Sequence, residues 1–182
     1  MSEQTIDRVI VLAMHGAPPN DFPRAEMGEF HALHARLEHG DPSMSDALKA
    51  RAGMLDRKMR GWSRTAENDP FWAASQEIAR HLSEITGSRV VVGFNEFCGP
   101  DLDAAFATAA AGRPGSVQVI TTMLTRGGGH AEVDIPAAIA RAQAAFPDVP
   151  FVYAWPHDMR DVARFLADRL QKAPVTAARQ PG

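Results

Sequence analysis

The sequence has few of the features that mark secreted, membrane or nucleic-acid-binding proteins. It contains one cysteine, Cys98, so no intramolecular disulfide can form, and a reducing compartment is compatible with the chain. No apolar run approaches the roughly 18 residues that a membrane span requires. The formal net charge of -3 gives no basic footprint for binding a phosphate backbone. We therefore expect neither a membrane nor a nucleic-acid partner.

The N-terminal residues also lack the pattern of a targeting segment. Residues 1–8 are largely acidic and polar, whereas a signal peptide has a basic region followed by a long apolar one. The expected location is the cytoplasm. With 182 residues, 45% hydrophobic and 23% charged, the composition is globular and the length suits one sizeable core. We expect a single domain over residues 1–172 and a disordered tail over residues 173–182.

Four short apolar segments predict buried strands, at residues 9–14, 89–94, 117–124 and 150–155. They are rich in β-branched or aromatic residues and are bounded by Gly or Pro. Segments with helical spacing lie between and after them, at residues 69–85, 100–111, 131–146 and 159–170. This alternation predicts an α/β fold with a parallel sheet, right-handed crossovers and helices on both faces.

Residues 24–68 break the alternation, because they contain helix-like pieces at 25–39 and 43–62 but no strand pattern. We interpret this stretch as a helical insertion after the first strand that forms a lid or an interface. Elsewhere, Pro70, Pro100 and Pro136 are expected in the first turns of their helices, where a missing N–H costs little. Gly87 and Gly112 are expected just past helix ends.

Three metal-binding side chains follow the ends of predicted strands. His15 comes directly after the first strand, Glu96 two residues after the second, and His130 in the loop after the third. Ligands of open parallel sheets bind outside the carboxyl ends of the strands, so these residues would converge if their strands are neighbours. Two imidazoles and a carboxylate suit divalent Co, Ni, Fe or Zn and leave coordination positions open for a substrate.

The loop before His130 carries three glycines, Gly127, Gly128 and Gly129. Their permissive backbone and free N–H groups at a helix start favour an anionic group such as a substrate carboxylate. Taken alone, a triple glycine is usually only a loop. The neighbouring Arg126 is a candidate partner for the same anion, or a solvated surface charge.

At these positions the chain resembles the CbiX-type, or class II, chelatases, which insert cobalt, iron or nickel into sirohydrochlorin. His15-Gly16 after the first strand resembles the family's opening motif. GFNEFCGP at residues 93–100 resembles its Phe-x-Glu-x-x-x-Pro segment, and GGHAEVDIP at residues 128–136 resembles its GGH-x-x-x-DIP signature. The resemblance covers about residues 7–23 and 70–170, which leaves the helical insertion unmatched.

The resemblance implies a chelatase-like (flavodoxin-like) three-layer fold and a lyase that handles its metal with His15, Glu96 and His130. It implies a tetrapyrrole substrate, a divalent metal (Co2+, Fe2+ or Ni2+) as the second substrate, and no organic cofactor. Cobalamin or sirohaem biosynthesis is the corresponding pathway. Short family members dimerise, so one copy of the motif set implies a homodimer. Arg126, Gly128 and Gly129 are then the expected substrate-binding residues.

The reaction needs a base, since the macrocycle loses two pyrrole protons when the metal enters. We expect His15 and His130 to hold the metal and accept these protons, while Glu96 desolvates or steers the ion. The alternative is a non-catalytic metal or tetrapyrrole carrier on the same fold.

Several other residues allow two interpretations of their role. His31 and His34 share one helix face and could form an accessory metal site, although exposed polar positions are the favoured interpretation. Cys98 could face the metal, but a buried apolar role is more common. His157 could line the pocket or simply precede a helix. Asp134 is assigned to the helix start.

Overall fold

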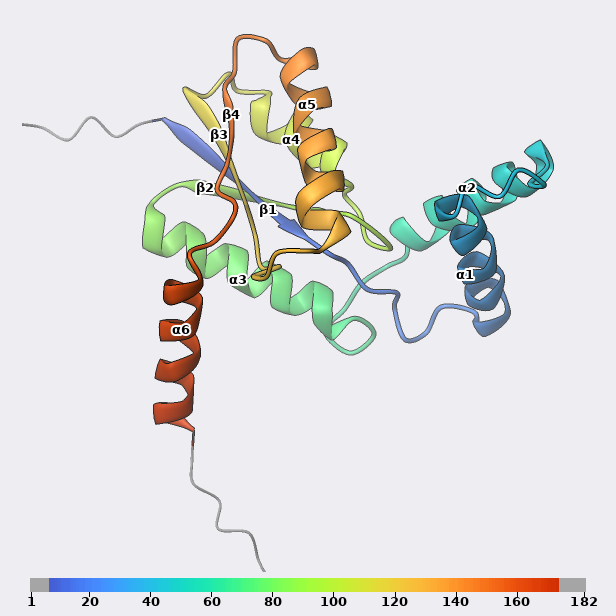
Figure 1. The fold of residues 1–182 in the computed structure, drawn as a ribbon, viewed down its shortest axis with the longest axis horizontal. Helices are drawn as coiled ribbons and strands as arrows, with labels where there is room; N and C mark the ends of the chain where they lie inside the picture. Colours follow the sequence, from blue (N-terminus) through green and yellow to red (C-terminus); the bar gives the residue numbers. More distant parts are fainter. Residues whose placement is uncertain (1–6, 174–182) are drawn as a thin grey trace, which may run out of the picture.

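The computed structural model describes residues 7–173, and its centre is a parallel sheet. The four strands are β1 (Arg8–Met14), β2 (Arg89–Phe94), β3 (Ser116–Thr121) and β4 (Phe151–Tyr153). Their order across the sheet is β2-β1-β3-β4, and each neighbouring pair is parallel (Figure 1). The predicted α/β architecture with a four-stranded parallel sheet is therefore confirmed.

The helices occupy the predicted regions. They are α1 (Arg24–Glu38), α2 (Asp46–Arg60), α3 (Pro70–Thr86), α4 (Leu102–Ala110), α5 (Ile135–Ala145) and α6 (Met159–Lys172), with a π-helical turn, η1 (His130–Asp134), directly before α5. Asp69 caps α3 by accepting a hydrogen bond from the Trp72 N–H, which satisfies a donor that the helix leaves unpaired. The same helix ends at Gly87, whose φ of 66° is left-handed, as the sequence predicts.

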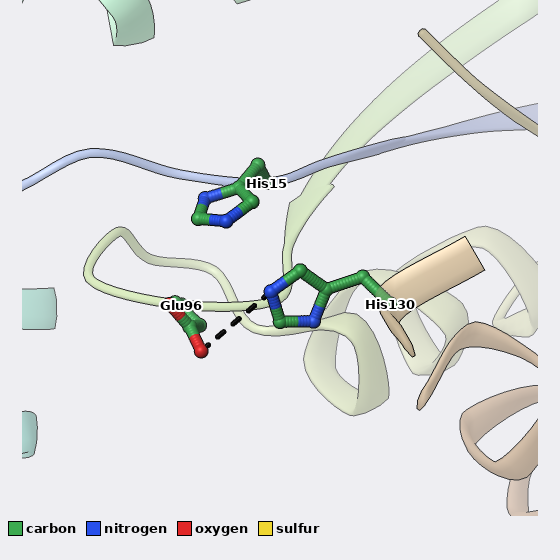
Figure 2. A group of neighbouring side chains, drawn as sticks. All are labelled: His15, Glu96 and His130. Atoms are coloured by element: carbon green, nitrogen blue, oxygen red, sulfur yellow. Dashed lines mark ion pairs between the residues drawn. The ribbon is translucent and has the colours of Figure 1, made fainter. Parts of the chain in front are cut away.

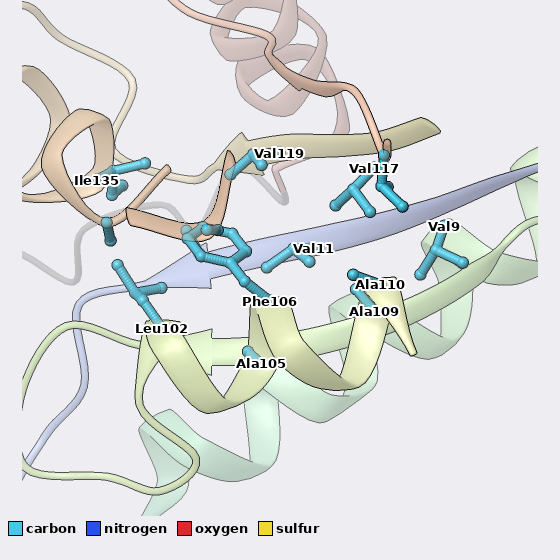
Figure 3. Packing of buried hydrophobic residues seen from close by; sticks show 14 residues of the cluster. Val9, Val11, Leu102, Ala105, Phe106, Ala109, Ala110, Val117, Val119 and Ile135 are labelled. Atoms are coloured by element: carbon cyan, nitrogen blue, oxygen red, sulfur yellow. The ribbon is translucent and has the colours of Figure 1, made fainter. Parts of the chain in front are cut away.

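Alternation along the strands divides the side chains between two layers of helices. On one face, Val9, Val11, Val117 and Val119 pack against α4 and α5, and the cluster they form is the largest core of the described chain (Figure 3). On the other face, a second cluster joins β1 and β2 to α3. Helices therefore lie on both faces of the sheet, which gives the three layers that were expected.

The helical insertion has an apolar cluster of its own. Phe30 and Leu33 of α1 pack against Leu55 and Met59 of α2, and all four are buried. In Figure 1 these two helices lie at one end of the molecule, beyond the end of β1. The insertion is thus a small helical hairpin attached at the edge of the sheet where the candidate ligands were expected.

Helix α6 differs from the others, because none of its residues is buried. Its apolar side chains Phe165, Leu166 and Leu170 are 55%, 53% and 77% exposed, and the helix extends away from the sheet in Figure 1. On the edge strand β4, Val152 is 52% exposed. Helix α6 and the edge strand β4 therefore expose apolar side chains.

Three details of the predicted elements were wrong. The third strand ends at Thr121 rather than residue 124, because its ladder partner on β1 ends near Ala13. The fourth is limited to Phe151–Tyr153, since it pairs only with residues 117–119 of β3. Pro100 precedes α4 instead of lying in its first turn, because the side chain of Asp101 caps the helix.

Two further expectations concern membrane-spanning helices and the C-terminal tail. Over residues 7–173, no helix combines the length and apolar character needed to cross a bilayer. The expected tail at residues 173–182 lies, apart from Ala173, outside the described residues.

Candidate metal and substrate site

The order of the strands brings the three candidate ligands together. β1 lies between β2 and β3, and the loops that carry His15, Glu96 and His130 follow these three strands at one edge of the sheet. Figure 2 shows the three side chains directed toward one another from separate segments. Their predicted convergence is confirmed as geometry.

The distances suit a single ion. One ligand atom from each of His15, Glu96 and His130 can be chosen so that all lie within 4.8 Å of one another. In the described part of the chain, these three residues form the group of His, Cys, Asp or Glu side chains that could hold a metal ion. His130 Nε2 is 3.6 Å from Glu96 Oε1, and the two imidazole centroids are 4.6 Å apart. The side chains of His130 and Glu96 are 22% and 17% exposed, so the site is sheltered but open to a ligand.

Each histidine is oriented through its other ring nitrogen. His15 Nδ1 lies 2.8 Å from the carbonyl oxygen of Gly16, and His130 Nδ1 lies 2.6 Å from Asp134 Oδ2. When both Nδ1 atoms carry the proton, these oxygens accept hydrogen bonds from them, and both Nε2 lone pairs are free for the site. Fixing the tautomer in this way is characteristic of histidines that bind metals.

Asp134 lies at the start of α5, as expected, and also has a second role. It makes no side-chain cap at the start of α5 and contacts His130 instead. The spacing of four residues between His130 and Asp134 was a signal for this contact, since such residues lie on one helix face. The π-helical turn that carries both of them was not visible in the sequence pattern.

The loops that carry His15 and Glu96 are tightly joined. The Glu96 N–H donates to the His15 carbonyl oxygen at 2.9 Å, and the Asn95 N–H donates to that of Met14 at 2.9 Å. Gly16, with φ of 102°, lies so close that a Cβ atom would be 1.9 Å from the Glu96 carbonyl oxygen. The glycine after His15 is therefore required by the close approach of the two loops.

Two arginines that the sequence analysis did not single out support the same loops. Arg60 donates to the carbonyl oxygens of Asn95 and Cys98, at 2.9 Å and 3.0 Å. Arg64 donates to those of Ala17 and Phe97, at 2.8 Å and 2.6 Å. Backbone carbonyls occur at every residue, so no sequence motif identifies such contacts.

The glycine loop is more open. Gly128 and Gly129 are exposed, and a Cβ atom on either would meet nothing within 4 Å. Arg126 is 71% exposed and pairs with Glu132 at 3.1 Å, and its guanidinium lowers the pKa of the Glu132 carboxyl. Binding of a substrate by Arg126, Gly128 and Gly129 stays a prediction.

The remaining candidates lie outside the ligand group. Cys98 is buried in the cluster that joins α3 to the sheet, and burial raises the pKa of its thiol to about 11, which disfavours the thiolate form that binds metals. His31 is separated from His15 by Phe97, whose ring centroid is 6.1 Å from one and 6.2 Å from the other. His157 Nε2 lies 2.9 Å from the Thr121 carbonyl oxygen, and α6 starts two residues later.

Comparison with known proteins connects this geometry to a family. A model of the CbiX family matches residues 60–173, a range that includes Glu96 and His130 but not His15. No curated protein sequence matches the chain.

Solved structures with a similar arrangement include the sirohydrochlorin chelatase SirB of Bacillus subtilis subspecies spizizenii in complex with cobalt, at 18% identity and a TM-score of 0.45. That match covers 91% of this chain and 50% of the Bacillus chain, so the chain spans about half the length of that chelatase. A protein described as a cobalamin (vitamin B12) biosynthesis CbiX protein, from Marinobacter aquaeolei VT8, is 17% identical with a TM-score of 0.45, over 91% of this chain and 96% of that one.

Proposed function

The chain belongs to the CbiX family, and from that premise we propose that it is a chelatase that inserts Co2+, Fe2+ or Ni2+ into sirohydrochlorin or a related tetrapyrrole. The observation that carries the proposal is the convergence of His15, Glu96 and His130, with ligand atoms within 4.8 Å of one another. Family membership supports the general class, a metal chelatase for tetrapyrroles. The choice of metal and macrocycle is our proposal.

The donor set fits a transition-metal substrate. Two imidazole nitrogens and one carboxylate oxygen suit divalent iron, cobalt and nickel, and three protein ligands leave positions for an incoming macrocycle. His130 Nε2 and Glu96 Oε1 are 3.6 Å apart. A divalent metal ion between these two atoms would accept a lone pair from each of them.

The proposed reaction forms metal–nitrogen bonds and breaks two pyrrole N–H bonds, so two protons leave the macrocycle for each ion inserted. His15 and His130 hold the metal and accept these protons as they release it, since imidazole can act as ligand and as base near neutral pH. Glu96 replaces water around the ion and steers it. The Asp134 carboxylate stabilises the imidazolium that forms at His130.

The tetrapyrrole is expected to meet the exposed glycine loop. Sirohydrochlorin is a polycarboxylate, and the N–H groups near Gly128 and Gly129, together with Arg126, offer donors for its carboxylates. Arg126 would exchange its contact with Glu132 for one with the substrate. This exchange is inexpensive because exposed ion pairs contribute little.

The decisive experiment follows the visible absorbance of the protein mixed anaerobically with sirohydrochlorin and Co2+. Wild type should convert the macrocycle to its metallated form faster than the spontaneous reaction, and His130→Ala should not. His31→Ala is the matched control, because His31 lies on α1 outside the ligand group, and it should keep the wild-type rate. Bound but unmetallated macrocycle would instead identify the alternative, a tetrapyrrole or metal carrier.

We also propose that the chain forms a homodimer through α6. An amphipathic helix with Phe165, Leu166 and Leu170 exposed is stabilised when that face is buried, and a second copy offers the same helix and the open surface near Val152. Sedimentation velocity should show a dimer for wild type and a monomer for Leu166→Glu. Equal sedimentation of the two would contradict this interface.

Three further proposals concern the domain, the location and the pathway of the protein. Residues 1–172 are proposed to act as a single domain, with the helical insertion as a part of it. A cytoplasmic location and a role in cobalamin or sirohaem biosynthesis follow from the proposed activity, and the metal that is inserted determines which of these pathways applies.

A further inference from the structure

The segment between α2 and α3 contacts both loops that carry His15 and Glu96, which a lid or an interface would not require. Arg60 is the last residue of α2, Arg64 lies in the following loop, and Asp69 caps α3. Arg64 and Asp69 form an ion pair whose side chains are only 5% and 1% exposed. Asp69 Oδ1 accepts from the Trp72 N–H at 2.8 Å, while Oδ2 faces the guanidinium of Arg64.

The guanidinium of Arg64 joins the two loops that carry metal ligands. Its Nη1 donates to the carbonyl oxygen of Ala17, two residues after His15. Its Nη2 donates to the carbonyl oxygen of Phe97, one residue after Glu96, and to that of Met59 at 2.9 Å. A planar fork of donors can bridge acceptors on separate segments in a fixed geometry, so one side chain fixes how these loops lie relative to each other.

Arg60 extends this support to the other side of Glu96. It donates to the carbonyl oxygen of Asn95, one residue before Glu96, and to that of Cys98, two residues after it. Its Nε donates to the Asp56 carboxylate at 2.9 Å. Both guanidinium groups therefore bind the backbone next to Glu96 without touching its carboxylate, and hydrogen bonds from a charged donor are roughly twice as strong as neutral ones.

A buried ion pair is a costly way to stabilise a fold, because an apolar pair of similar volume often serves as well. Arg64 even has its Nε buried without a partner. The feature that apolar side chains cannot provide is donation to several carbonyl oxygens at once. The arrangement is thus explained by the positions it imposes on the loops.

We propose that Arg64, oriented by Asp69 and assisted by Arg60, is a positioning residue that sets the His15–Glu96 half of the metal site. The segment after α2 then positions the ligand loops of the chelatase centre, in addition to any role of α1 and α2 as a cover. This inference rests on the proposed function, because it assigns the arginines to the metal site described above.

The test compares Arg64→Lys with wild type in Co2+ binding, without tetrapyrrole, followed by the d–d absorption of the bound ion. Lysine keeps the charge beside Asp69 but cannot bridge the Ala17 and Phe97 carbonyl oxygens. We expect affinity to fall about 10-fold to 100-fold, the range typical when groups that orient metal ligands are lost. The d–d spectrum should also change, since the ligand geometry changes.

The matched control is Arg51→Lys, the same substitution at an ion pair of the insertion. Arg51 binds Glu29 through Nε and Nη2, at 2.8 Å and 2.5 Å, and touches neither ligand loop. The Co2+ affinity should stay within about two-fold of wild type and the d–d spectrum should not change, because exposed ion pairs contribute little. Arg60→Lys, at a partly exposed position, gives a second test if Arg64→Lys does not fold, and should weaken binding several-fold.

Wild-type affinity and an unchanged spectrum in folded Arg64→Lys, or in Arg60→Lys if the first variant does not fold, would overturn the inference even if thermal stability falls. Such a result would make the arginines purely structural.

The proposed function fails in a different way: wild type would bind Co2+ without accelerating insertion into sirohydrochlorin. If wild type bound no Co2+, amide exchange of the Glu96 N–H, which donates to the His15 carbonyl oxygen, would test the positioning role without metal. Exchange should then be at least about 10-fold faster in Arg64→Lys than in Arg51→Lys, because exchange reports local opening, and equal rates would overturn the inference.

Discussion

The two sides of the proposed metal site are built differently. His15 and Glu96 stand on loops joined by backbone hydrogen bonds, by the close approach of Gly16 and by Arg60 and Arg64. His130 stands at the end of an exposed glycine loop, and the side-chain contact that orients it comes from Asp134. The comparison indicates one side held by many contacts, which would define the ligand geometry, and one open side through which the proposed metal and macrocycle would enter.

Substitution of glycine tests this contrast most strongly. In Gly16→Ala, the new Cβ would be 1.9 Å from the Glu96 carbonyl oxygen at a φ of 102°. We expect the free energy of unfolding to fall by roughly 2–4 kcal/mol, from left-handed strain and overpacking. Gly128→Ala, where a Cβ meets nothing within 4 Å, should change it by no more than about 0.5 kcal/mol. Urea unfolding measures both, and equal losses would remove the contrast.

The reactivity of Cys98 reports on the side of His15 and Glu96 alone. Burial raises the pKa of this thiol from 9.0 to about 11, so at pH 8 the folded protein holds about 100-fold less thiolate than the unfolded chain. Alkylation of native protein should be slower by at least that factor than alkylation in urea. Rapid native labelling would show that the loops around Cys98 open readily.

The same shift predicts a pH dependence of stability. The folded state retains the Cys98 proton more strongly than the unfolded state, since its pKa is raised from 9.0 to about 11. The stabilisation is fully present below pH 9 and is lost as the pH rises toward 11. Urea unfolding of wild type and Cys98→Ala between pH 8 and 11 should show a steeper decline for wild type, and parallel declines would contradict the assignment.

Removal of the Asp134 carboxylate, which supports His130 on the open side, should have a smaller effect. Asp134→Asn leaves a neutral partner at His130 Nδ1, 2.6 Å from the present carboxylate oxygen, and Co2+ affinity should fall about 10-fold. Glu132→Gln is the control, because Glu132 pairs with Arg126 on the same turn and has no contact with His130. Calorimetric titration with Co2+ measures both, and equal affinities for the two variants would contradict a role for Asp134 in orienting His130.

Much of this arrangement could be predicted from local pattern. The strands are short apolar runs, and parallel strands bring their carboxyl ends to one edge, so His15, Glu96 and His130 were expected to meet there if their strands were neighbours. The limits of β3 and β4 were missed because a strand ends where its partner ends. The contact between Asp134 and His130 was missed, because the sequence pattern did not reveal the π-helical turn that carries both residues.

The sequence by itself determined the strands, the helices and the three candidate ligands, because apolar spacing and the chemistry of histidine and glutamate are local properties. Only the tertiary structure revealed that Arg60 and Arg64 hold the loops beside these ligands and that α6 buries none of its residues. An arginine that binds backbone carbonyls has no partner of particular residue type, and an amphipathic helix has the same pattern whether its apolar face is covered or open. Such features depend on which distant segments meet in space, and that is decided by the packing of the whole chain.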